Sequence, residues 1–417
     1  MVESQGKIDC VTGFSLKKLL LIAVVLFPLI SCGSAQEEAG WINSSDGQLR
    51  RMAEAILVDV IESSGLEILE QIQVDYRTPE EMSDYVRFKL EQDLPKSKES
   101  HVAESYRLLG LFPEDLNLRQ TLSSLYEEQV IGFYNPDDKT LYLQEEVPIG
   151  NLESLLAHEM VHALQDQHFD LNALTDGALN NDQSAAVMAA IEGHATLAML
   201  DLMSKNNRSA GLDIEDVLEF GKSIVNGFES AEIEGGLLGT VPLVLRETMI
   251  FPYIEGARFV QVMRDKDGIK SVPFEAKLPK STQQVMHFDG SDIEEMIVPR
   301  SIEITPSDNW IKLYENTLGE LEVSLFLEEL TGRKSSAEGW RGDRFVLLEG
   351  IEDNRTLVWV SFWDTVEDRN EFSETVESHI ELLGEEVRIS SMSIDGFAGL
   401  SINIGPEADV EVILETN

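Results

Sequence analysis

The stretch LLAHEMVHALQDQHFD, from Leu155 to Asp170, decides the interpretation of this sequence. Its apolar residues are so frequent that we expect a buried helix, because little polar surface is left for solvent. The same stretch carries two histidines four residues apart, with a glutamate directly after the first: His158, Glu159 and His162. Unpaired polar groups inside a protein cost about 2–7 kcal/mol each. These side chains therefore need partners, either hydrogen-bonding neighbours or a bound cation.

The segment from His158 to His162 has the pattern His-Glu-x-x-His. Residues four apart on an α-helix lie about 40° apart around its axis, so both imidazoles project from one face and can reach one Zn²⁺. Glu159 lies about 100° round the helix from His158, which suits a general base acting on a zinc-bound water better than a third ligand. Chance predicts only about 0.02 such patterns in a chain with 7 histidines and 76 acidic residues. The alternative is a pair of hydrogen-bonded core histidines.

A catalytic zinc site needs a third protein ligand and one open position. The candidates are Glu192, His194 and His168. His168 follows the motif by only six residues, near the end of the same helix, where we expect it to point elsewhere. Glu192 and His194 belong to a second apolar helix, expected from about Gln183 to Met203. They are two residues apart and face about 200° away from each other, so only one of them can face the metal.

The surroundings of Glu192 favour the glutamate as the third ligand. Its neighbours at helical spacing are small or apolar, which suits packing against the first helix. A carboxylate on such a face needs a counter-charge, which a metal ion supplies. Gly193 permits a close approach between helices. Histidine is the commoner zinc ligand, which is the argument for His194; we expect His194 instead to be a hydrogen-bonding residue outside the ligand set.

The two helices together resemble a known family. His-Glu-x-x-His followed by a second helix with Glu-Gly-x-Ala is similar to the gluzincin branch of the zincin metallopeptidases. The resemblance covers roughly Val130 to Met203. It implies that His158, His162 and Glu192 bind zinc and that Glu159 is the general base of peptide-bond hydrolysis.

The segment GFYNPDDKTLYL before the first helix predicts a β-hairpin, because two β-rich runs flank the turn sequence NPDD. It is similar to the edge-strand region beside the active-site helix of zincins, so we expect peptide substrate along the strand near Tyr142. Asn151 is expected to cap the helix that follows. Gluzincins also usually place a Tyr or His where it stabilises the oxyanion. Tyr253 and His287 are the candidates, and each also fits an ordinary packed residue.

The N-terminal sequence predicts a targeting signal. Two lysines precede an apolar run from Leu19 to Ile30, which is short for a membrane span but fits the core of a signal peptide. The following LISC resembles a bacterial lipobox, in which the chain is cut before the cysteine and the cysteine is acylated. We therefore expect a lipoprotein signal peptide at 1–31, lipid on Cys32 and a flexible tether at 32–48. The alternatives are a plain secretory signal with an incidental cysteine, or an uncleaved anchor.

The charge of the chain limits its partners. The 417 residues include 76 acidic and 32 basic side chains, for a formal net charge of −44. Such a charge repels nucleic acid and anionic membrane surfaces, so we expect no nucleic-acid partner and membrane contact through the N-terminal lipid only. A solvated acidic coat explains the charge; the alternative is a dedicated cation-binding role. Cys10 and Cys32 are the only cysteines, which predicts no structural disulfide. We expect no run after the signal segment to be long or apolar enough to cross a membrane.

The predicted fold class is α+β. Residues 49–313 are expected to form a mainly helical, zincin-like metallopeptidase domain with a small sheet beside the first helix. The tail changes to strands around a helix, which predicts a small α+β unit at 314–417.

The predicted function is zinc-dependent hydrolysis of a peptide or protein substrate, lipid-anchored on the extracytoplasmic side of a bacterial cell envelope. The competing hypothesis is a zincin-fold envelope lipoprotein that binds or assembles without peptidase activity. A third is an acidic lipoprotein without metal. The intact Glu159 argues against the second hypothesis, because a binding protein has no need of a general base.

Overall fold

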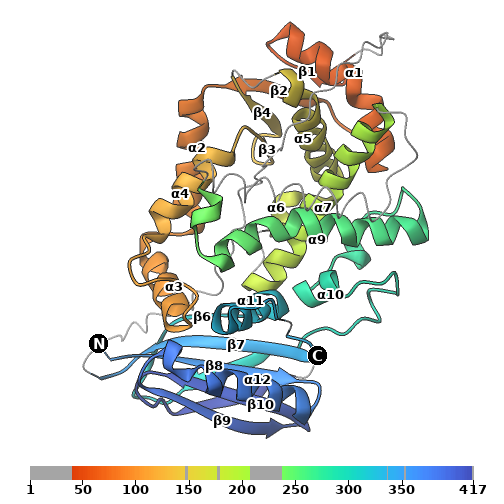
Figure 1. Ribbon diagram of the computed structural model, residues 1–417. Coiled ribbons are helices and arrows are strands. Elements are labelled where there is room, and N and C mark those ends of the chain that lie inside the picture. The colour runs from red at the N-terminus through yellow and green to blue at the C-terminus, as the bar shows by residue number, and fades with distance from the viewer. Residues whose placement is uncertain are drawn as a thin grey trace, which may run out of the picture.

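The computed structural model describes residues 40–145, 149–175, 179–206, 237–335, 337–351 and 354–415. The expected signal peptide and Cys32 lie outside these residues. Figure 1 shows a mainly helical upper part and a β-rich lower part, with three sheets in all among the described residues. This arrangement confirms the predicted α+β class.

The upper part contains a four-stranded sheet in the order β1-β2-β4-β3. Its strands are β1 (Ile42–Asn43), β2 (Ile72–Arg77), β3 (Gly132–Asn135) and β4 (Thr140–Gln144). Strands β1, β2 and β4 are parallel, and β3 pairs antiparallel with β4, which confirms the predicted hairpin. Strand β1 lies within the segment expected to be a tether, where Ile42 is buried in the core.

The strand of Tyr142 is not an edge strand of this sheet, whose edge strands among the described residues are β1 and β3. Strand β4 is paired on both sides, with β2 and with β3. The expectation that substrate lies along the strand near Tyr142 is therefore wrong as far as backbone pairing is concerned. The hairpin is visible in the sequence, but which of its two strands pairs with β2 depends on a contact between distant segments.

Helices surround this sheet. Their bounds are α1 (Gly47–Ser64), α2 (Pro79–Asp93), α3 (Lys96–Leu108), α4 (Leu118–Gln129), α5 (Ile149–Phe169), α6 (Leu171–Thr175), α7 (Asn181–Asn206), α9 (Leu243–Asp267) and α10 (Thr282–Met286), with short 3-10 turns η1 (Leu238–Thr240) and η2 (Glu275–Lys277). The start of α2 follows directly from local sequence, because Thr78 and Glu81 form a reciprocal capping box. Helix α5 begins at Ile149, so Asn151 lies inside it, contrary to the expected cap.

Helix α7 is a buried core helix. The most apolar 18-residue window of its segment Asn181–Ser204 has a mean hydropathy of 1.3, and the segment is long and apolar enough to cross a membrane by length and composition alone. That finding contradicts the expectation that no such run follows the signal segment. However, 83% of its most apolar window is buried inside the protein, where other helices of the chain cover it. A helix that is apolar all round is typical of such a core position.

Helices α7 and α9 cross at two glycines. A Cβ atom on Gly193 would lie 2.1 Å from the carbonyl carbon of Gly256, and one on Gly256 would lie 2.3 Å from the carbonyl oxygen of Ala189. No side chain fits between the two backbones. Gly193 thus allows a close helix approach, as expected, but the partner is α9 and not the first helix of the motif pair.

The lower part is built on a five-stranded antiparallel sheet in the order β6-β7-β8-β10-β9. Its elements are β6 (Ile311–Asn316), α11 (Gly319–Thr331), β7 (Trp340–Glu349), β8 (Arg355–Trp363), α12 (Val366–Ser378), η4 (Ile380–Leu383), β9 (Val387–Ile394) and β10 (Phe397–Ile404). Helices α11 and α12 pack on one face through Phe326, Phe372 and Trp359. On the other face lie β5 (Ile302–Pro306) and the last strand β11 (Val410–Leu414), which pair with each other.

Helix α11 joins the two parts, between the lower sheet and helices α7 and α9 (Figure 1). Buried carboxyl groups gather at this junction. Thr282 donates from its backbone N–H and its hydroxyl to Asp182, at 2.7 and 2.6 Å. Tyr106 donates to Glu322 at 2.5 Å. Burial raises the pKa of Asp182 to about 7, that of Glu322 to about 8 and that of Asp343 to about 6.

Candidate metal centre

Helix α5 places the motif in the core of the upper part. Its apolar residues pack under the sheet, and the side chains of His158, Glu159 and His162 are at most 1% exposed. Four-residue spacing brings the two imidazoles to one face, and their ring centroids are 4.7 Å apart. The predicted helical arrangement of the motif is therefore confirmed.

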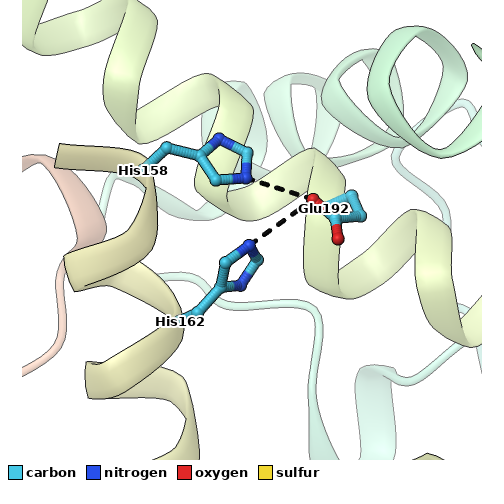
Figure 2. Close-up of side chains that lie close together, drawn as sticks. All are labelled: His158, His162 and Glu192. Atoms are coloured by element: carbon cyan, nitrogen blue, oxygen red, sulfur yellow. Dashed lines mark hydrogen bonds and ion pairs between the residues drawn. The ribbon is translucent and has the colours of Figure 1, made fainter. Parts of the chain in front are cut away.

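Helix α7 supplies the third group. The Oε2 atom of Glu192 lies 3.1 Å from Nε2 of His158 and 3.5 Å from Nε2 of His162. Figure 2 shows the three side chains converging on one point from two helices. One potential ligand atom from each residue lies within 4.8 Å of the other two. Within the described ranges this is the only group of three or more His, Cys, Asp or Glu side chains so arranged.

The other candidate histidines lie elsewhere. His194 makes hydrogen bonds at 2.9 Å with the Ser64 carbonyl and at 3.0 Å with Gln165. His168 contacts the carbonyl oxygen of Glu67 at 2.7 Å, at an exposed position. His287 hydrogen-bonds Glu320 on α11 at 2.6 Å. The choice of Glu192 over His194 and His168 thus agrees with the geometry.

The side chains of His158, His162 and Glu192 shift one another's pKa values. Burial by itself raises the pKa of Glu192, but the charge of His162 and the hydrogen bond with His158 outweigh this effect, and the pKa is lowered to about 2. Burial by itself lowers the pKa of His162, but Glu192 outweighs it and brings the pKa to about 9. Burial lowers the pKa of His158. Glu192 is thus an anion that needs a positive partner, either a proton on His162 or a metal ion.

Several polar atoms of the cluster remain without a hydrogen-bond partner in the described part of the chain. They are Nδ1 of His158, both carboxylate oxygens of Glu159, Nε2 of His162 and Oε1 of Glu192. An unsatisfied buried polar group costs about 1–3 kcal/mol, and more when it is charged. A cation between the two Nε2 atoms and the Glu192 carboxylate would satisfy two of these atoms, Nε2 of His162 and Oε1 of Glu192. This group of residues can therefore hold a metal ion.

Glu159 and Tyr253 line the same site without joining the ligand group. Burial raises the pKa of Glu159 to about 8, against the lowering effect of the His162 charge. Tyr253 comes from α9, directly after Pro252, and its ring centroid is 6.5 Å from that of His158. Burial raises the pKa of Tyr253 well above its usual value, and the charges of Glu192 and Glu159 add to the effect. Of the two oxyanion candidates, the structure thus brings Tyr253 to the cluster and His287 to α11.

The sequence alone did not point to Gln165. This residue lies on α5, and its side chain contacts His162 on the same helix and His194 on α7. Its Oε1 atom lies 2.8 Å from Nδ1 of His162, and the side chain is fully buried. A signal was available in its position three residues after His162, which places both side chains on one helix face. A buried glutamine at that spacing needs hydrogen-bond partners.

Comparison with known proteins concerns the lower part alone. No curated protein and no solved structure matches the chain significantly. One family match starts at β6 and ends within β10, so both helices of the candidate metal centre lie outside it. Residues 311–399 match the family described as Domain of unknown function (DUF8575).

Proposed function

We propose that this protein is a zinc-dependent peptidase with a zincin-like catalytic site. His158, His162 and Glu192 would hold Zn²⁺, and Glu159 would be the general base. The observation that carries the proposal is the buried convergence of two imidazoles and one carboxylate, beside a second carboxylate that ligates nothing. Two histidines and one glutamate, with a position left open, form a common ligand set of catalytic zinc.

The chemistry divides between the metal and the chain. A bound Zn²⁺ lowers the pKa of a coordinated water to near 7 and polarises a carbonyl group. The Glu159 carboxylate accepts a proton from the attacking water and returns it to the leaving nitrogen. Burial raises the pKa of Glu159, which makes its carboxylate a stronger base than an exposed glutamate. The Tyr253 hydroxyl, held protonated by its raised pKa, is positioned to donate to the developing oxyanion.

Strand β3, whose four residues are buried, is an edge strand of the upper sheet among the described residues, and this position supports a peptide as the substrate. The Gln144 N–H donates to the Ile131 carbonyl at 2.8 Å. In the antiparallel pattern that follows, the backbone groups of Gly132 and Tyr134 point away from β4. An extended peptide adds to such an edge through main-chain hydrogen bonds. The backbone amide of Tyr134 also lies close enough to Glu159 to lower its pKa, so this edge runs past the general base.

We also propose that the protein is a lipoprotein on the extracytoplasmic side of a bacterial envelope. Support comes from the apolar run at Leu19 to Ile30 and the LISC sequence that ends at Cys32. The two cysteines of the chain are then accounted for, one in the signal peptide and one under lipid. The metal-binding helices would face the compartment outside the membrane that anchors the chain.

The decisive experiment replaces the general base and keeps the ligands. We expect Glu159→Gln to retain one zinc per chain by elemental analysis, because Glu159 is not a ligand. Cleavage of a proteome-derived peptide library, read by mass spectrometry, should fall at least 10²–10⁴-fold. Glu153→Gln is the matched control, with the same substitution in the same helix but outside the cluster.

The outcomes separate the hypotheses. Equal cleavage by wild type and Glu159→Gln would refute the mechanism. Zinc in the wild-type protein with no cleavage of any library peptide would favour the envelope binding protein. No zinc in the wild-type protein would leave the acidic lipoprotein.

A further inference from the structure

A chain of buried hydrogen bonds leads from the metal cluster to the end of helix α1. Nδ1 of His162 lies 2.8 Å from Oε1 of Gln165. Nε2 of Gln165 lies 2.9 Å from the carbonyl oxygen of Ile191 and 3.0 Å from Nδ1 of His194. Nε2 of His194 lies 2.9 Å from the carbonyl oxygen of Ser64. The side chains of these histidines and of Gln165 are fully buried, so water does not compete for the bonds.

Two backbone carbonyls fix the direction of every bond in this chain. A carbonyl oxygen only accepts, so the Ser64 carbonyl requires the proton of neutral His194 on Nε2 and leaves Nδ1 as an acceptor. The Ile191 carbonyl likewise requires the NH₂ end of the Gln165 amide, whose second N–H then donates to His194. The oxygen end of Gln165 must therefore face His162. A carboxamide oxygen accepts, so Nδ1 of His162 carries a proton.

We propose that Gln165 is a positioning residue that holds His162 with Nδ1 protonated and Nε2 directed at the metal site. The lone pair that a metal ion needs is then on the nitrogen that faces Glu192 (Figure 2). The orientation is set by the carbonyls of α1 and α7 through Gln165, and not by His162 itself. Where the inference concerns metal affinity it rests on the proposed function; the proton positions do not.

The two cluster histidines differ in this respect. Nδ1 of His158 has no hydrogen-bond partner within the described residues, whereas Nδ1 of His162 has Gln165. His162 is thus the histidine whose tautomer and ring orientation the protein sets in advance. A metal-ligating imidazole that loses such a partner commonly loses 10–100-fold in metal affinity.

The sequence offers a closely matched control. Gln167 lies two residues further along α5, and its side chain also makes three hydrogen bonds to the chain. It accepts from the backbone of Leu69 and Glu70 at 2.7 and 3.0 Å and donates to the Glu70 carbonyl at 3.0 Å. These bonds lie at an exposed position away from the cluster. A variant of Gln167 therefore measures the general effect of losing a hydrogen-bonding glutamine from α5, and a variant of Gln165 measures in addition the effect on His162.

The test combines proton NMR of imidazole N–H groups with zinc competition against a chromophoric chelator. In the wild-type protein, both without metal and with zinc, we expect a slowly exchanging Nδ1–H signal from His162 and an Nε2–H signal from His194. Gln165→Leu should lose the protected His162 signal and bind zinc 10–100-fold more weakly. Gln165→Glu keeps an oxygen that accepts from Nδ1 of His162 but loses both N–H donors to the Ile191 carbonyl and His194, so it should restore part of the affinity. Gln167→Leu should match the wild type in both readouts.

Each contrary result overturns the inference. A wild-type His162 without a protected Nδ1–H signal would show that the bond direction is wrong, and this measurement needs no variant. Equal zinc affinity in Gln165→Leu and the wild type would show that Gln165 does not position the ligand. Equal losses in Gln165→Leu and Gln165→Glu would reduce it to a packing residue. If the wild type bound no zinc, the proposed function would fail, while the NMR signals would still test the bond chain.

Discussion

Adding one methyl group at the crossing of α7 and α9 should distort the metal cluster. The Cβ atom of Gly193→Ala would lie 2.1 Å from the carbonyl carbon and 2.3 Å from the carbonyl oxygen of Gly256. Carbon atoms in contact are normally about 3.5–4.0 Å apart, so the helices must separate locally by roughly 1.5 Å. Both close atoms are backbone, so no side-chain rotation relieves the clash. Glu192 directly precedes Gly193 on α7 and must move with the helix.

The size of the effect follows from competing contributions. Alanine is favoured over glycine by about 1 kcal/mol inside a helix, so the substitution would stabilise an uncrowded site. Overpacking a well-packed core costs about 1–3 kcal/mol, occasionally more. A net loss of stability requires the clash to exceed the propensity gain. Metal affinity should also fall, because a site held within about 0.5 Å of its working geometry tolerates no shift of that size.

The assay is thermal unfolding followed by circular dichroism, together with zinc competition. We expect Gly193→Ala to unfold below the wild type, by roughly 1–4 °C, and to bind zinc more weakly. The control is Gly47→Ala in α1, where the nearest atom to the new Cβ is Arg51 Nη1 at 3.5 Å, an ordinary contact. This variant should unfold at the wild-type temperature or slightly above it. A Gly193→Ala protein with unchanged melting temperature and zinc affinity would refute the reasoning.

Three further predictions concern other parts of the chain. Glu192→Ala should cost most of the zinc affinity, whereas His194→Ala should cost much less, because the Ile191 carbonyl still orients Gln165. Zinc titration of equally folded variants checks this, and the reverse order of affinities would remove Glu192 from the ligand set. As the pH rises from about 5 to 8, the free energy of unfolding should decrease. Asp182 and Glu322, with pKa values of about 7 and 8, keep their protons in the folded state, whereas the unfolded state releases these protons above about pH 4. Urea titrations across this range should show a smaller slope for the pair Asp182→Asn and Glu322→Gln, and a rise in stability with pH would contradict the assignment. Cys32→Ala should release the protein from the membrane fraction, and a wild-type N-terminus found unmodified at another residue would exclude the lipid anchor.

The sequence by itself determined the features that depend on short-range geometry. The four-residue spacing of His158 and His162 places both imidazoles on one face of any α-helix, whatever surrounds it. The capping box of Thr78 starts α2 through contacts three residues apart. The NPDD turn joins β3 to β4 for the same reason. In each case the interacting groups are close in the chain, so the local pattern sufficed.

For Glu192 and His194 the sequence limited the possible arrangements but did not determine their positions. Helical spacing showed that Glu192 and His194 could not both face the motif, and the small residues around Glu192 favoured it. Only the packing of α7 against α5 put Glu192 within 3.1 Å of His158. The same packing turned His194 toward Ser64, in a helix more than a hundred residues earlier. Spacing limited the possibilities, and tertiary contact chose among them.

Other features belong to the tertiary structure alone. Among the described residues, β3 rather than β4 is an edge strand because β4 pairs with β2, a strand that lies more than 60 residues earlier in the chain. Tyr253 approaches His158 because Gly193 and Gly256 let α9 press against α7. The proton positions along Gln165 are set by carbonyls from two other helices. These arrangements depend on contacts between segments that are far apart in the sequence. A local sequence pattern does not determine which distant segment will pack against it.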